Sequence, residues 1–123
     1  MYQEYNPNPC GKWVGDCVIR ALTKILDLEW KEVYTGLALE GLKMCDMPSS
    51  NTVWGKYIVD RGYLPYTAEM ETAKQFADTH PNGKYLLATG THAIALVDGI
   101  IYDAWDSSSE LISYYFKEDD NEL

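Results

Sequence analysis

The sequence predicts a single α+β domain in which helices come first and a mainly antiparallel sheet follows. The chain has 123 residues, of which 46% are hydrophobic, and this is enough for one compact core. From Asp16 to Thr79 the apolar residues follow a helical period, whereas from Lys84 to Phe116 short apolar runs alternate with turn residues. Helices followed by strands are typical of the α+β class.

Four helices are expected in the first two thirds of the chain. The first starts with Asp16 as its N-cap, or with Cys17 as its first residue, and directs Val18, Leu22 and Ile25 inward. The others are expected over residues 29–44, from the caps at 48–51 through Ile58, and over residues 72–79. Residues 2–15, rich in proline and glycine, are expected to form an extended arm without regular structure.

Four strands are expected after the helices, over residues 84–89, 92–97, 100–105 and 111–116. The turn between the second and third strands leaves two registers open. If Asp98-Gly99 is a two-residue turn, Val97 pairs with Ile100, and Asp103 shares the face of His92. A three-residue loop instead places Asp106 opposite His92. The acidic residues 117–123 are expected to be a frayed tail.

The composition excludes several classes of function. A net charge of −9 disfavours nucleic acid as a partner, because binding to the phosphate backbone depends on Lys and Arg. No apolar stretch is long enough to span a membrane, and the first residues do not resemble a signal peptide, so a cytoplasmic protein is expected. Three cysteines without metal spacing predict free thiols, and neither a metal nor a cofactor is implied. The oligomeric state is not indicated.

Cys17 is the candidate nucleophile because it lies at the expected start of a helix. The partial positive charge and free N–H groups of a helix N-terminus favour a thiolate and can bind an oxyanion. A small core cysteine on the inner face of a helix is the competing interpretation. Arg20, one turn further on, can pin the Asp16 carboxylate or remain on the surface.

His92 is the candidate general base because it opens an apolar strand that precedes a hairpin with acidic residues at its exit. A core histidine bonded to a backbone carbonyl is the alternative. His80, which precedes Pro81, is interpreted as a helix C-cap residue. Cys10 and Cys45 have no histidine nearby in the sequence and are interpreted as structural.

Several segments resemble the small papain-like cysteine peptidases of bacteria and their phages. They are Gly15-Asp-Cys17-Val-Ile-Arg-Ala-Leu22, Trp30-Lys-Glu-Val-Tyr34, Gly83-Lys-Tyr85, Thr91-His92-Ala-Ile-Ala-Leu-Val-Asp-Gly99 and Tyr102-Asp-Ala-Trp-Asp-Ser107. The resemblance implies helices led by the nucleophile helix, an antiparallel sheet, and a cleft where Cys17 and His92 meet. It also implies Asp106 as the third member of the triad, with Asp103 in reserve.

The resemblance has one gap, at the glutamine that usually completes the oxyanion hole about six residues before the cysteine. Gly11 occupies that place here, so Asn8, Lys12 or Asn6 are the candidate substitutes. The function implied is hydrolysis of a peptide or amide bond through a thioester. The alternatives are a phage-type peptidoglycan amidase or endopeptidase, and a non-catalytic papain-like protein that binds and inhibits a host factor. The partner is a peptide or protein in the first case.

Overall fold

The computed structural model describes residues 1–119, and this part of the chain is an α+β fold with four helices and one six-stranded mixed sheet. The helices are α1 (Cys17–Leu26), α2 (Trp30–Met44), α3 (Asn51–Val59) and α4 (Ala73–Thr79). The strands are β1 (Tyr2–Glu4), β2 (Tyr63–Thr72), β3 (Lys84–Ala88), β4 (Ala93–Val97), β5 (Ile100–Asp103) and β6 (Leu111–Glu118). The predicted α+β class is confirmed, and each of the four expected helices is present.

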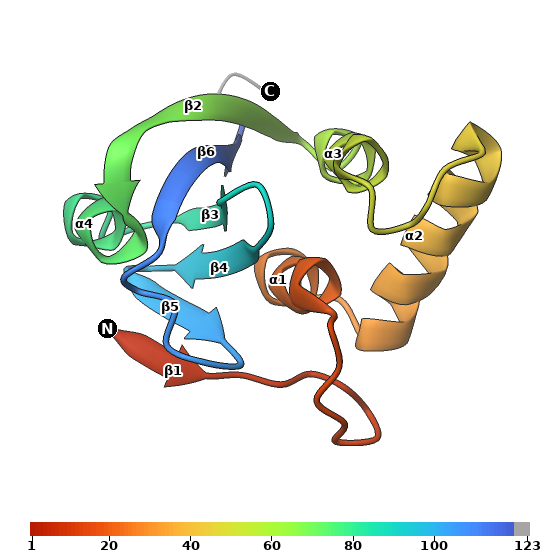
Figure 1. The fold of residues 1–123 in the computed structure, drawn as a ribbon, viewed down its shortest axis with the longest axis horizontal. Helices are drawn as coiled ribbons and strands as arrows, with labels where there is room; N and C mark the ends of the chain where they lie inside the picture. Colours follow the sequence, from red (N-terminus) through yellow and green to blue (C-terminus); the bar gives the residue numbers. More distant parts are fainter. Residues whose placement is uncertain (120–123) are drawn as a thin grey trace.

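The strands lie in the order β1-β5-β4-β3-β6-β2, as can be followed in Figure 1. β1 pairs with β5 in parallel, and the other neighbouring pairs are antiparallel. The central strands β3 and β4 are apolar and nearly fully buried, which agrees with helices covering both faces of the sheet.

Residues of β4 alternate between two cores. Ala93 and Ala95 face the cluster formed with α1, α2 and α3, whereas Ile94 and Leu96 belong to the cluster formed with α4. Figure 1 shows α1 against the middle of the sheet and α4 on its other side. The small alanine side chains let α1 pack close to β4, so the first residue of α1 lies near the first residue of β4.

Two strands lie where the sequence predicted none. Residues 2–4 of the expected arm form β1 at one edge of the sheet. Residues 63–72 form β2 at the other edge, with an irregular register between Thr67 and Glu71. β2 contains Pro65 and is mostly exposed, so it lacks the hydrophobic alternation that identifies a strand in a sequence. The prediction of an irregular arm over the whole of residues 2–15 was therefore wrong at its start.

The expected frayed tail is also shorter than predicted. Lys117 and Glu118 belong to β6, where they pair with Leu64 and Tyr63 of β2, and the Asp119 N–H donates to the Gly62 carbonyl. The rest of the predicted tail, residues 120–123, lies outside the described residues. Within the described part of the chain, no helix combines the length and apolar character required to cross a bilayer.

Candidate active site

Cys17 is the first residue of α1, as the sequence predicted. Asp16 occupies the N-cap position, but its carboxylate makes no capping hydrogen bond. It accepts instead from Arg20 Nη1 at 2.5 Å and from Trp30 Nε1 at 2.8 Å. The first hydrogen bond of the helix runs from the Arg20 N–H to the Asp16 carbonyl. The N–H groups of Cys17, Val18 and Ile19 therefore precede the helical hydrogen-bond ladder, next to the half-buried thiol.

His92 lies immediately before β4 and is fixed by a tight turn. Its N–H donates to Thr89 Oγ1, and its carbonyl accepts from the Thr89 N–H, each at 3.0 Å. Gly90 in this turn has φ +99°, a conformation that side chains rarely adopt. The imidazole is 12% exposed and stacks on the Trp105 indole, with ring centroids 5.0 Å apart. The turn thus holds the ring at the start of β4, where His92 and Cys17 line the same cavity.

The β4–β5 hairpin has the shorter of the two predicted turns. Val97 pairs with Ile100, and Asp98 and Gly99 both have positive φ, at 49° and 79°. This turn type is the one that Asp-Gly favours. The resulting register places Asp103 on the face of His92, and Asp103 Oδ2 lies 2.7 Å from His92 Nε2.

The expectation that Asp106 contacts His92 was wrong. Asp106 lies beyond the end of β5 on the surface, where its carboxylate accepts from the Ser108 N–H at 3.1 Å and from the Ser108 hydroxyl. Asp103, the reserve candidate, occupies that place instead. The two-residue turn is the physical reason, because a change of one residue in register moves every following side chain to the other face.

Asp103 is 1% exposed and has every carboxylate lone pair in use. Oδ1 accepts from Arg20 Nε at 3.1 Å and from the Ala104 N–H at 2.7 Å, and Oδ2 accepts from Ser107 Oγ at 2.6 Å as well as contacting His92. Burial raises the pKa of this carboxyl, but its hydrogen bonds with His92 and Ser107 and the His92 charge lower it further, so the net shift is downward. Asp103 is therefore ionised and held in one orientation.

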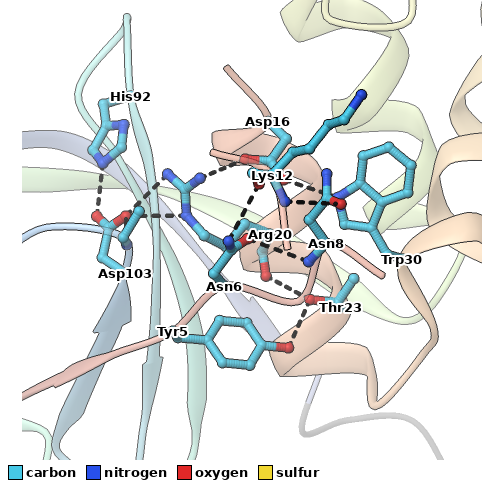
Figure 2. Close-up of polar contacts among 11 residues, drawn as sticks. Tyr5, Asn6, Asn8, Lys12, Asp16, Arg20, Thr23, Trp30, His92 and Asp103 are labelled. Carbon is cyan, nitrogen blue, oxygen red and sulfur yellow. Dashed lines mark hydrogen bonds and ion pairs between the residues drawn. The ribbon is translucent and has the colours of Figure 1, made fainter. Parts of the chain in front are cut away.

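Arg20 connects the helix to the sheet. Its side chain is 7% exposed and bridges two carboxylates, with Asp16 on its own helix and Asp103 at the end of β5 (Figure 2). The sequence left open whether this residue was on the surface or paired with Asp16, and it did not predict the contact with Asp103. Ser107 was also missed, because a serine in a loop gives no signal of burial.

The Cys17 thiol and the His92 imidazole line the same cavity and shift each other's pKa. Burial raises the pKa of Cys17, but hydrogen bonds from His92 and the Ala93 N–H, with the charges of His92 and Arg20, outweigh burial and lower it. Burial lowers the pKa of His92, but its hydrogen bonds with Asp103 and Cys17 and their charges raise it to about 9. The opposite shifts favour a thiolate–imidazolium pair over the neutral pair.

A cavity of about 440 Å³ opens beside the thiol and the imidazole. Apolar and aromatic side chains form much of its wall, with contributions from Val18, Ile19, Tyr34, Leu37, Trp54 and Tyr114. Its volume is in the range of pockets that hold small ligands or substrate side chains. No lysine or arginine side chain is among its lining residues.

The expected oxyanion-hole side chains are not at the site. Asn8 Oδ1 accepts from the Cys10 and Lys12 N–H groups, and Asn6 Nδ2 donates to the Lys12 carbonyl, so these residues organise the loop before α1 (Figure 2). None of the three lines the cavity. The donors next to Cys17 are backbone N–H groups at the start of α1.

The remaining candidate residues lie elsewhere. His80 is the C-cap of α4, as predicted, and its N–H donates to the Ala77 carbonyl. Cys10 and Cys45 are exposed free thiols. Within residues 1–119, no three His, Cys, Asp or Glu side chains gather into a group that could hold a metal ion.

No protein-family model, curated protein or solved structure matches this chain.

Proposed function

We propose that the protein is a papain-like cysteine hydrolase that cleaves a peptide or amide bond through a thioester. The observation that carries the proposal is the hydrogen bond from Asp103 to His92 together with the shared cavity wall of His92 and Cys17, whose pKa values shift in opposite directions. A nucleophile within reach of a base that a third group orients is the arrangement nucleophilic catalysis requires. Cys17 is the proposed nucleophile, His92 the acid and base, and Asp103 the group that orients His92.

In the first half of the proposed reaction, the Cys17 thiolate attacks the substrate carbonyl carbon and forms a C–S bond. The tetrahedral intermediate collapses as His92 gives its proton to the leaving amine and the C–N bond breaks. In the second half, water attacks the thioester and gives a proton to neutral His92. The C–S bond breaks, and the acid product leaves with the thiolate–imidazolium pair restored.

Backbone donors take the place of the missing glutamine in this proposal. The Cys17 N–H is at the N-terminus of α1, where the helix dipole also favours a negatively charged oxygen. Side chains are not required for such a site, because backbone N–H groups alone serve as oxyanion donors in other enzymes.

The cavity favours a peptide with a bulky apolar side chain as the substrate. Its aromatic and aliphatic wall gains free energy from burying such a side chain. The carboxylates of a peptidoglycan stem peptide would find no lysine or arginine in the cavity wall, since Arg20 is bound to two carboxylates beneath it. We therefore rank peptide cleavage above peptidoglycan cleavage.

Incubation of the protein with a peptide library tests this function, with mass spectrometry to locate the cleaved bonds. We expect cleavage near bulky apolar residues by the wild type and by Cys45→Ala, and none by Cys17→Ala. Clearing of a peptidoglycan suspension without peptide cleavage would favour the amidase alternative. If neither substrate is cleaved and Cys17 shows no enhanced reactivity, the non-catalytic binding protein becomes the better interpretation.

A further inference from the structure

We propose that Arg20, balanced by Asp16, is a positioning residue that keeps His92 able to lose its proton during the second half of the reaction. This inference rests on the proposed function and assigns a role to charges that the triad itself does not use. The groups form one buried chain in which Asp16, Arg20, Asp103 and His92 are linked by direct contacts (Figure 2).

The buried groups of the resting site carry charges of opposite sign in contact with one another. Asp103 is 1% exposed, so its negative charge needs a cation in contact. Protonated His92 and Arg20 both provide one, at Oδ2 and Oδ1 respectively. Asp16 is also buried and accepts from Arg20 and from the Trp30 N–H. Asp16, Arg20, Asp103, His92 and Cys17 thus alternate in sign when the thiolate is formed.

Acylation removes two of these charges. The thiolate becomes a neutral thioester, and His92 passes its proton to the leaving amine. Once His92 is neutral, Arg20 is the cation of the two that still contacts Asp103. Without Arg20, the buried carboxylate would favour retention of the proton on His92, and a protonated imidazole cannot accept a proton from water. Arg20 therefore lowers the pKa of His92 when its neutral form is required.

Asp16 sets the strength of this effect. Its carboxylate lies 2.5 Å from Arg20 Nη1 and offsets part of the guanidinium charge. Removal of Asp16 should leave more positive charge near Asp103 and lower the pKa of His92, whereas removal of Arg20 should raise it. Other titratable groups near Asp103 include Glu4, its register partner in β1, Tyr2, whose hydroxyl donates to the Asp103 backbone carbonyl, and exposed Asp106. All three are unchanged in these variants.

An NMR titration of His92 in the Cys17→Ala background tests the inference without requiring a substrate. This background removes the thiolate, as acylation does, and the chain has only two histidines to assign. We expect Arg20→Met to raise the pKa of His92 by about one unit and Asp16→Asn to lower it. Arg20→Lys retains the charge and should shift the pKa by less than half as much as Arg20→Met.

The direction of the two shifts decides the outcome. A purely structural role would loosen the site in both variants and move the pKa of His92 in the same direction, and this result would overturn the proposal, as would no shift in either variant. If Arg20→Met does not fold, Asp16→Asn alone carries the test: a lower pKa supports the proposal, and an equal or higher one overturns it.

A kinetic measurement separates this inference from the function on which it rests. With an activated ester, hydrolysis of the acyl-enzyme by Arg20→Met should slow about tenfold at neutral pH, whereas acylation should change less. Equal losses in both steps would contradict the role of Arg20. Absence of any acyl-enzyme in the wild type would contradict the proposed function, while the NMR result would still stand.

Discussion

The two histidines have similar settings but different partners. Each is half-buried and stacks on an aromatic ring, His80 on Phe76 at 3.8 Å between centroids and His92 on Trp105 at 5.0 Å. His80 Nδ1 contacts the Phe76 carbonyl at 2.8 Å and the Thr79 hydroxyl at 3.0 Å, and both of these groups are neutral. His92 contacts the buried Asp103 carboxylate and shares a cavity wall with the Cys17 thiol.

The partners of His80 lie within four residues of it, whereas those of His92 are 11 and 75 residues away in the sequence. The local, neutral partners of His80 place it at the end of α4. The partners of His92 come from α1 and β5 and form a set of interacting charges with it. Neither burial nor stacking therefore distinguishes His92, the proposed acid and base, from His80. The charged groups that the fold brings to the ring distinguish it.

The largest expected effect on activity is the difference between removal of the His92 ring and removal of the His80 ring. His92→Ala should lower kcat/KM for peptide cleavage by about 10⁴-fold, because the variant loses both the proton donor and the group that favours the thiolate. His80→Ala should retain activity within about threefold in protein that is still folded. Activity assays beside circular dichroism measure both. Similar losses in the two folded variants would remove the distinction between the histidines.

Asp103 and Asp106 should show the next largest difference in kcat/KM between variants. Asp103→Asn should lower kcat/KM by about 10²-fold or more, since an amide cannot stabilise the imidazolium and can favour the wrong tautomer. Asp106→Asn should have little effect, because its exposed carboxylate accepts hydrogen bonds from Ser108 and does not contact His92. Steady-state kinetics of both variants check the assignment, and the reverse order of effects would restore Asp106 as the third member.

The stacked tryptophan should have a smaller effect. Trp105 covers the His92 ring while remaining 46% exposed itself. Trp105→Ala should lower kcat/KM by about two- to tenfold, the range that corresponds to the loss of one aromatic contact. Trp13→Ala is the matched control, because Trp13 is 60% exposed and does not line the cavity. Equal effects of the two variants would mean that the stacking contributes nothing specific.

The smallest expected effect is on stability in acid. The pKa of Asp103 is lowered in the folded state, so its ionised form contributes stability that is fully present above the unfolded value of 3.8 and is lost as the pH falls through the folded pKa. The difference in free energy of unfolding between wild type and Asp103→Asn should therefore narrow as the pH falls below 3.8. Urea titrations at several pH values measure it, and a constant difference would contradict the assigned ionisation.

The sequence predicted the parts of the fold that have a clear hydrophobic periodicity or a turn-forming residue pair. The start of α1 and the hairpin that follows His92 are examples, because a cap and an Asp-Gly turn are local signals. The edge strands β1 and β2 were missed, since one is three residues long and the other is exposed and contains a proline. Edge strands need little hydrophobic alternation, and periodicity therefore does not detect them.

The site was predicted in part. Their positions at a helix start and a strand start singled out Cys17 and His92, and the two line one cavity, as the family resemblance implied. The choice of Asp106 over Asp103 came from the family resemblance, whereas the chemistry of the Asp-Gly turn favours the register that selects Asp103. The burial of Arg20 could not be predicted, because it depends on the approach of α1 to β5 and leaves no pattern in either segment.

The rate of Cys17 alkylation by iodoacetamide across pH, with Cys10 and Cys45 as internal references, measures whether His92 activates the Cys17 thiol. Mass spectrometry of peptides after short exposures distinguishes the three thiols. Although both reference cysteines are more exposed, Cys17 should react fastest at pH 6, and His92→Ala should abolish this advantage. If Cys17 reacts no faster than the two reference thiols at any pH, no activated thiolate exists, and the proposed hydrolase mechanism is contradicted.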